Sequence, residues 1–446
     1  MKKTVSFVFL CFFTLSAAFS APYEVSGNSG KVEEIEFSGK NKVFVFDGLA
    51  GATITLTADV EIDTAVCKTF LATAPTGSLA DFTVDTLTRQ ITVSNLSDAT
   101  GYIFLINETE YAYIYVLDYN NYLPTIHSVD AEGDCVATDV TAKFSIPSLV
   151  FYLPASGTTA ILERPALERN FILKYKTLQW NENAEKFDEK ESKTEPIPRN
   201  YLLLGSYTWY SLDSIFINTK FTLTGENDPY VKKFGQKVEM ESAEFVAQKP
   251  VIKALGELTL REAKNEREKG NDKERRNLSG SAPMDVNLRA HANTPLARDF
   301  TWYIYEKQQP EVPVSYSREQ EFNLKFSVYG TYVARVTTTT ENDCVATDSV
   351  TIEVTESEID IPNVFTPNDD SFNDKFCVAF KSIVKYNIWI YNRWGRLVFS
   401  SNSPENCWDG YIGNQKAATG AYYYKIEATG ADGKKYKRAG DINLLR

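Results

Sequence analysis

The chain has 446 residues, 43% of them hydrophobic and 24% charged, which is typical of folded globular proteins. Its formal net charge of −12 argues against a general nucleic-acid binder or a protein that coats anionic membranes. The length suggests about three or four domains. Tyr, Phe, Val, Ile and Thr crowd the apolar runs, and that mixture favours β-sheet.

The N-terminus has the layout of a secretory signal peptide. Two lysines precede an apolar run over residues 5–13, and Ala18-Phe19-Ser20 fits a cleavage site before Ala21. The run is too short to span a bilayer, and no later stretch is long and apolar enough to do so. We therefore expect residues 1–20 to be removed on export, and we expect no transmembrane segment in the mature chain.

Alternating apolar and polar residues predict short strands along the first half of the chain. Residues 21–146 contain runs such as KVFVFDGL, and Tyr111, Tyr113 and Tyr115 share one face of a strand. For this row we favour cross-strand packing within a sandwich over an exposed binding face. Residues 147–258 repeat the strand pattern in NFILKYKTLQW and SIFINTKFTLTG. We predict an immunoglobulin-like β-sandwich for the first block and a second β-sandwich for the next.

The segment REAKNEREKGNDKERRN, residues 261–277, mixes charges of both signs without an apolar repeat. Such a segment cannot bury enough apolar surface to fold alone. We interpret residues 259–280 as an exposed interdomain linker that proteases can reach.

The next block, residues 281–356, places a strand with Trp302 before a Gly330-x-Tyr332 corner and two final strands. With SAPMDV and GTYVARV, this order resembles PKD-like modules and implies an immunoglobulin-like sandwich. The hexapeptide DCVATD stands here at residues 343–348 and also at residues 134–139. Each copy follows a Tyr-rich strand and precedes a strand that we take as the last of its block. We interpret the copies as the equivalent corner of two related sandwiches.

Five cysteines remain in the chain after residue 20, and export supplies an oxidising compartment. We expect a disulfide between Cys67 and Cys135, which share the first block. Cys377 and Cys407 share the last block, and whether they pair is left open. Cys344 has no cysteine in its own block, so we expect a free, buried thiol. The alternative pairs Cys344 with the C-terminal block.

The most specific motifs lie in residues 357–446, where YNIWIYN and GAYYYKIEA also predict strands of a small β-sandwich. The motif residues, in order, are Pro362, Asn363, Phe365, Thr366, Pro367, Asn368, Asn373, Asp374, Asn392, Arg393, Trp394, Gly395, Trp408, Asp409, Gly410, Gly420 and Tyr422. Their succession resembles the gliding-motility-associated C-terminal domain, the type B sorting domain of the type IX secretion system of Bacteroidota. The family loop usually reads Asn-Gly-Asp-Gly, whereas Asp369 and Ser371 replace the glycines here and tolerate positive φ less well.

The resemblance implies export by that system through its outer-membrane translocon, with a PorP/SprF-type barrel protein as a further partner. No common hydrolase, metalloprotease or P-loop motif occurs in the mature chain. It has no C-x-x-C pair and only two histidines, His127 and His291, which argues against a zinc site. We predict no metal ligands and no cofactor, and metal binding by the Asn/Asp-rich loop is left open.

The fold class that we expect is all-β, with tandem immunoglobulin-like sandwiches followed by a β-sandwich sorting domain. The expected function is that of a non-enzymatic exported protein, secreted or associated with the outer membrane at the cell surface. It would have an adhesion role or an accessory role in secretion or gliding. The alternative is a secreted enzyme with an unrecognised catalytic site in residues 147–258.

Overall fold

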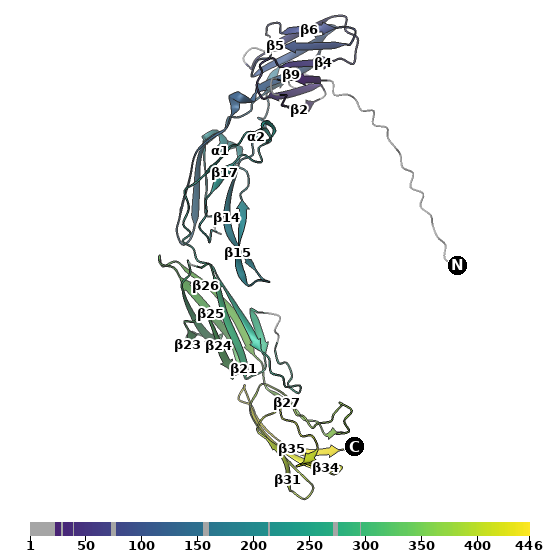
Figure 1. The fold of residues 1–446 in the computed structure, drawn as a ribbon, viewed down its shortest axis with the longest axis vertical. Helices are drawn as coiled ribbons and strands as arrows, with labels where there is room; N and C mark the ends of the chain where they lie inside the picture. The colour runs from purple at the N-terminus through teal and green to yellow at the C-terminus, as the bar shows by residue number, and fades with distance from the viewer. Residues whose placement is uncertain are drawn as a thin grey trace, which may run out of the picture.

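The structure is a computed structural model that describes residues 23–446 except 28–29, 39, 73–76, 155–159, 213–214, 271–274 and 295. The expected signal peptide therefore lies outside the described residues. Four pairs of packed β-sheets follow one another along a curved line from the N-terminal to the C-terminal part of the chain (Figure 1). The prediction of an all-β chain of tandem sandwiches is confirmed.

The first sandwich packs the sheet β1-β4-β7-β6 on the sheet β2-β3-β9-β8-β5. The alternating segments bury Phe44, Leu56 and Phe104 between the two sheets. Its elements are β1 (Tyr23–Ser26), β2 (Val32–Ser38), β3 (Asn41–Phe46), β4 (Thr53–Thr57), β5 (Ala65–Phe70), β6 (Asp81–Asp85), β7 (Gln90–Ser94), β8 (Thr100–Ile106), β9 (Thr109–Asp118) and the 3-10 helix η1 (Tyr119–Tyr122).

The second sandwich packs β10-β11-β16 on β15-β14-β17-β18 around Phe171, Trp209 and Phe221. A small pair, β12-β13, and two short helices accompany these sheets. The elements are β10 (Thr125–Gly133), β11 (Thr138–Ser145), β12 (Tyr152–Pro154), β13 (Ile161–Glu163), β14 (Ile172–Asn181), β15 (Lys186–Lys193), α1 (Arg199–Leu204), β16 (Ser206–Trp209), β17 (Thr222–Thr224), α2 (Pro229–Phe234) and β18 (Glu239–Glu241).

The third sandwich packs β19-β21-β24 on β20-β26-β25-β22-β23. Trp302 is fully buried, and the Tyr332 hydroxyl donates to the carbonyl of Val328 at 3.0 Å, as in a tyrosine corner. The strands are β19 (Ile252–Thr259), β20 (Asn277–Gly280), β21 (Met284–Ala292), β22 (Asp299–Glu306), β23 (Gln309–Ser317), β24 (Glu321–Phe326), β25 (Gly330–Thr339) and β26 (Val345–Val354).

The C-terminal sandwich is built on the sheet β28-β35-β34-β30-β31, with the two-stranded pairs β27-β29 and β32-β33. Its strands are β27 (Glu358–Asp360), β28 (Val364–Phe365), β29 (Ala379–Lys381), β30 (Ile383–Tyr391), β31 (Leu397–Ser401), β32 (Tyr411–Ile412), β33 (Gln415–Lys416), β34 (Gly420–Gly430) and β35 (Lys435–Leu444).

Strand pairing moves two of the expected boundaries. β11 carries the end of the first DCVATD copy and pairs with β10 and β16, so it belongs to the second sandwich and does not close the first. β19 pairs with β21 and buries Ile252 and Leu258 in the third core, so it does not belong to the second block. An alternating pattern shows that a segment is a strand, but long-range pairing decides which sheet contains it.

The first and second sandwiches share an apolar cluster. Tyr113 and Tyr115 of β9 pack in this cluster with Leu149 and Phe151 of the second block. The tyrosine row is thus packed, as expected, but two of its members pack against the neighbouring block. Burial of this surface on both sides favours a fixed arrangement of the two sandwiches.

A buried arginine completes this junction. The Arg169 guanidinium donates from Nε to Asp228 at 2.8 Å, and the two side chains are 2% and 0% exposed. Nη1 of Arg169 donates to the carbonyl of Pro147 at 3.0 Å and to that of Tyr122, at the end of the first sandwich, at 3.5 Å. Asp228 also accepts from the N–H groups of Tyr230 and Val231 as the cap of α2. Removal of either partner would leave an uncompensated buried charge.

The two DCVATD copies meet face to face. The first copy contains the β10–β11 turn, the second begins in the β25–β26 turn and continues into β26, and a disulfide joins Cys135 to Cys344. The predicted Cys67–Cys135 pair and the predicted free Cys344 are therefore both wrong. Cys67 is a free, buried thiol in the first core, where burial raises its pKa to about 12.

The copies are not equivalent corners either. Asp134 accepts from the N–H groups of Val136 and Ala137, whereas Asp343 adopts a positive φ of 60°. The two identical segments thus have different backbone conformations on the two sides of the disulfide.

We predict that non-reduced peptide mapping of the exported chain will find Cys135 linked to Cys344. Each half of this disulfide lies on a hairpin turn whose strands fix its position. Alkylation of the native protein should leave Cys67 unmodified, because the thiol is buried and its thiolate is disfavoured. A Cys67–Cys135 peptide in the map would contradict the placement of β10 and β11 in the second sandwich.

We predict that Arg169→Ala lowers the free energy of unfolding of the first two sandwiches by about 3–5 kcal/mol, because Asp228 would keep a buried, unpaired charge. Chemical denaturation followed by tyrosine and tryptophan fluorescence measures this loss. The control is Lys220→Ala, which breaks the exposed pair with Glu241 and should cost about 0.5 kcal/mol or less. Equal losses in the two variants would refute a specific role for the buried pair.

Candidate functional site

Several sorting-domain motif residues form one buried cluster. Phe365 of β28, Trp408 and Tyr422 of β34 are 1%, 1% and 5% exposed. The Trp408 ring lies 5.3 Å from the Phe365 ring and 4.9 Å from the Tyr422 ring, measured between centroids. The indole N–H of Trp408 donates to the carbonyl of Tyr411 at 2.9 Å. These three motifs, far apart in the sequence, therefore act together as determinants of the core.

Backbone geometry explains the glycines in the same motifs. Gly410 has a φ of 76°, and a Cβ there would lie 3.0 Å from Pro367 and 3.3 Å from Phe365. Gly420 has a φ of 134° and precedes Tyr422, whose hydroxyl donates to the carbonyl of Ala418 at 2.8 Å. The corner Gly420-x-Tyr422 thus repeats the geometry of Gly330-x-Tyr332 in the third sandwich.

The remaining motif residues near this cluster hold the chain ends of the domain together. The carbonyl of Asn363, next to Pro362, accepts from the N–H of Asn443 at 2.9 Å, beside the parallel pairing of β28 with β35. Asp409 caps the turn after Trp408 by accepting from the N–H of Tyr411 at 2.9 Å. Close by, Cys377 is joined to Cys407, and Phe376 pairs with Trp408 through both backbone groups.

The loop over residues 366–374 keeps a glycine-type backbone without glycines. Asp369, Ser371 and Asn373 have φ values of 64°, 72° and 53°. The Asp374 carboxylate accepts from the N–H groups of Asn368, Asp369 and Ser371 at 3.0, 2.7 and 2.7 Å. Thr366 closes the loop, because its N–H donates to the carbonyl of Asn373 at 2.8 Å. These hydrogen bonds offset the strain that positive φ costs residues with a Cβ.

The Asn392-Arg393-Trp394-Gly395 motif forms the β30–β31 turn. The Asn392 side-chain oxygen accepts from the N–H groups of Trp394 and Arg396 at 3.0 Å each, and Gly395 has a φ of 76°. Trp394 is 75% exposed, and the Arg393 guanidinium lies 4.2 Å from its ring centroid. This turn therefore presents an aromatic ring and a cation to the surroundings, unlike the buried motifs.

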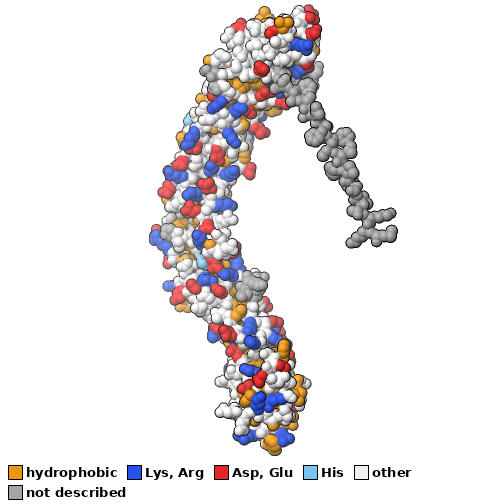
Figure 2. Space-filling view, turned by 45° about the vertical axis from the view of Figure 1, so that its right-hand side comes forward, with side chains coloured by type: hydrophobic (Ala, Val, Ile, Leu, Met, Phe, Trp, Pro, Cys, Tyr) orange, Lys and Arg blue, Asp and Glu red, His pale blue; other side chains and the backbone are white. Residues whose placement is uncertain are grey.

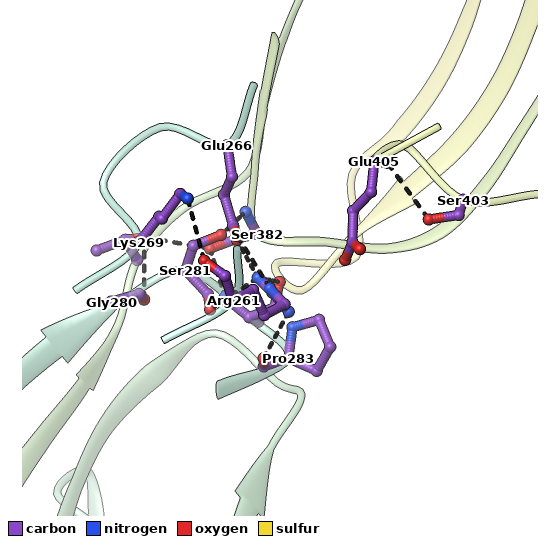
Figure 3. Close-up of polar contacts among 11 residues, drawn as sticks. Arg261, Glu266, Lys269, Gly280, Ser281, Pro283, Ser382, Ser403 and Glu405 are labelled. Carbon is purple, nitrogen blue, oxygen red and sulfur yellow. Dashed lines mark hydrogen bonds and ion pairs between the residues drawn. The ribbon is translucent and has the colours of Figure 1, made fainter. Parts of the chain in front are cut away.

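The charged segment that we expected to be an exposed linker is docked at the junction of the third and C-terminal sandwiches (Figure 3). Arg261 forms an ion pair with Glu266, whose side chain is 1% exposed, and donates to the carbonyl of Pro283 at 2.6 Å. The N–H of Arg267 donates to the carbonyl of Phe380 at 2.8 Å. The expectation of an unpacked linker is wrong for residues 261–270, because Arg261, Glu266 and Arg267 have partners in this junction.

Further hydrogen bonds join the docked segment to the C-terminal sandwich, and the third sandwich to the C-terminal one. Asn265 donates to the carbonyls of Val378 and Pro404 at 2.8 and 2.7 Å. Ser281 and Ser382 face each other in the same junction: Ser281 Oγ accepts from the N–H of Ser382 at 2.6 Å, and Ser382 Oγ from the N–H of Ala282 at 3.1 Å. The mixture of charges in the sequence was the only signal of this network, and it did not reveal the partners.

One surface groove of the second sandwich bears on the enzyme alternative. This surface groove of about 410 Å³ is lined by Lys174, Lys176 and Lys220 with several glutamates. Lys174 donates to Glu226 at 2.7 Å, and this hydrogen bond raises the pKa of its ammonium group. A catalytic lysine needs a lowered pKa to act as a nucleophile or base, so this environment works against that role.

Among the described residues, no group of three or more His, Cys, Asp or Glu side chains could hold a metal ion. None of the helices within those ranges is long and apolar enough to cross a membrane.

Two family models match parts of the chain. Residues 359–444 match the CHU_C type IX secretion signal domain, and residues 127–242 match a fibronectin type III domain. The resemblance of the C-terminal motifs to a type IX sorting domain is thereby confirmed, and the chain is marked as a type IX secretion substrate. A comparison with curated proteins found no match.

Several solved structures are similar to the chain at low identity. One is the tetra-tandem repeat in the extending region of a large adhesion protein, at 10% identity and a TM-score of 0.25, covering 91% of this chain and 99% of that one. Dimeric latent PorU from Porphyromonas gingivalis has 10% identity and a TM-score of 0.16, covering 76% and 36%. Protocadherin Gamma B2 cadherin domains 3–6 have 9% identity and a TM-score of 0.19, covering 91% and 98%. The fold assignment rests on the sheets themselves.

We predict that trypsin cuts the folded wild-type chain only slowly at Lys264, Arg267 and Lys269. Arg261→Ala leaves the Glu266 carboxylate buried without its partner, so local stability should fall by about 3 kcal/mol and cleavage there should accelerate. Timed digestion with mass mapping of the fragments measures the change. Rapid cleavage of the wild type at these residues would show that the segment is not docked in solution.

Proposed function

We propose that the chain is a non-enzymatic protein that the type IX secretion system carries across the outer membrane to the cell surface or the medium. The observation that carries this proposal is the match of residues 359–444 to the secretion signal domain. The ordered motifs support it, because they divide into a buried core that folds the domain and an exposed turn at Trp394.

The passenger, meaning the three sandwiches that precede the signal domain, has an adhesion role or an accessory role in the secretion or gliding apparatus. Its support is the architecture: sandwiches joined end to end expose long sheet surfaces and hold them apart from the signal domain (Figure 1). Proposed partners are the outer-membrane translocon and a PorP/SprF-type barrel. The lysines in the groove of the second sandwich are each paired with a glutamate, and this pairing favours such a role over catalysis.

We predict that deletion of residues 357–446 leaves the mature protein in the periplasm of a bacterium that has a type IX system. The truncated chain loses the signal domain but keeps the three passenger sandwiches, each with its own core. Cell fractionation and protease accessibility on intact cells measure the distribution.

The control for this deletion is Leu87→Ser in the first sandwich, which changes a side chain that is 95% exposed and should not alter export. Circular dichroism of the purified truncated protein checks that its sheets persist. Arrival of the folded, truncated protein at the surface would refute the signal-domain assignment.

A further inference from the structure

The five-stranded sheet of the C-terminal sandwich has one covered face and one open face. Ile388, Ile390 and Ile426 point into the core, where each is 2% exposed or less. The alternate residues point the other way, and among them Trp389 and Tyr391 are partly buried while Tyr423 is 50% exposed. None of these three aromatic side chains belongs to a hydrophobic cluster of the described residues. They therefore lie on an unpartnered sheet face.

Strand register orders this face into an aromatic end and a basic end. Tyr391 lies opposite Tyr423, and Trp389 lies opposite Lys425, whose ammonium group is 5.3 Å from the indole ring centroid. Further along the same strands, register places Lys435 and Lys437 on β35 beside Thr429 and Glu427 of β34. We call these residues, Trp389, Tyr391, Tyr423, Lys425, Lys435 and Lys437, the outer face.

The aromatic end lies far from the passenger. The β34–β35 turn contacts the third sandwich, because the N–H of Tyr329 donates to the carbonyl of Ala431 at 2.9 Å. Tyr391 and Tyr423 stand at the opposite ends of β30 and β34 from that contact, next to the exposed turn at Trp394. A partner could therefore reach the aromatic end while the passenger stays folded and attached.

Charge distinguishes this domain from the rest of the chain. Residues 357–446 hold 12 Lys and Arg against 10 Asp and Glu, a net charge of +2, whereas the whole chain has −12. Blue and orange side chains gather together at the C-terminal end of the molecule, while red and blue alternate along its middle (Figure 2). The surface therefore suits a partner that presents carboxylates around apolar side chains.

The pattern of charge favours a folded protein over a lipid surface. Glu427 forms a 2.9 Å ion pair with Lys425 in the middle of the outer face, and Asp441 stands opposite Tyr423. An anionic membrane would repel these two carboxylates, whereas a protein can place single cations against them. Trp and Tyr are also enriched among interface hot spots.

We propose that the outer face is the surface by which the signal domain docks onto an acidic, apolar patch of a protein of the export apparatus. This inference rests on the proposed function and specifies the kind of partner that reads the signal. Binding centred on the aromatic end would bury the tyrosine pair and leave the lysines of the basic end at the rim, where they accelerate and orient the encounter.

The test compares two double variants of the full chain in a bacterium that has a type IX system. Tyr391→Ser with Tyr423→Ser removes the aromatic pair, and Lys435→Glu with Lys437→Glu reverses two exposed charges. Each variant should lower the ratio of surface to periplasmic protein by about tenfold, as expected for loss of central anchors or steering charges. Thermal unfolding of the purified variants checks the fold, and the lysine variant changes only exposed side chains.

A matched control exists on the third sandwich. Tyr303 and Tyr316 are opposed on β22 and β23 and are 40% and 70% exposed, so their replacement by Ser removes a similar tyrosine pair from a similar sheet face. This control should be exported like the wild type. An equal export defect in the control would remove the specificity of the outer face.

The outcomes separate this inference from the proposed function. If deletion of residues 357–446 blocks export but both outer-face variants reach the surface normally, the docking surface is wrong and the signal assignment stands. If the deletion does not block export, the proposed function itself fails. Binding of the purified wild type, but not of the lysine variant, to phosphatidylglycerol vesicles would overturn the protein partner in favour of a membrane surface.

Discussion

The disulfide between Cys135 and Cys344 joins two halves of the molecule that are each held together by burial. The first and second sandwiches share an apolar cluster, and the third sandwich meets the signal domain through the docked segment around Glu266. Between the second and third sandwiches, ion pairs of Glu185 with Arg275 and Arg289 accompany the packing of Leu296 against the second core. The disulfide therefore adds a covalent bond to a junction that also contains apolar packing and the buried Asn293, which donates to the carbonyl of Phe216 at 2.7 Å.

An arginine occupies a similar environment in each of the two buried junctions, between the first and second sandwiches and between the third and C-terminal sandwiches. Arg169 and Arg261 each pair with a carboxylate that is almost fully buried, and each also donates to backbone carbonyls at the ends of strands. Planar guanidinium groups suit this position because they satisfy several acceptors at once. A buried ion pair adds little net stability compared with an apolar contact, but it tolerates few geometries. We therefore attribute to these arginines the direction in which one sandwich follows another.

The sequence predicted the fold class and the signal domain because both depend on local patterns. Alternation identifies strands such as β30 and β34, and motifs such as Asn392 to Gly395 mark a turn wherever it occurs. The pairing of Cys135, the sheet that contains β11 and the docking of residues 261–270 depend on partners far away in the chain. Local patterns cannot specify such partners, and mixed charges look alike whether water or a neighbouring domain satisfies them.

The docked segment also explains how the signal domain can be attached to a folded passenger and still be accessible to a partner. It occupies the end of the C-terminal sandwich where Ser382 and Ala431 face the third sandwich, and it leaves the opposite end at Trp394 exposed. Between these two ends, the Cys377–Cys407 bond and the ring contact of Trp408 with Tyr422 hold the segment around Trp408 against the core. Attachment uses the β34–β35 turn, whereas the aromatic end of the outer face lies at the opposite end of the sheet. Fixing the passenger in place therefore does not cover the tyrosine pair proposed for docking.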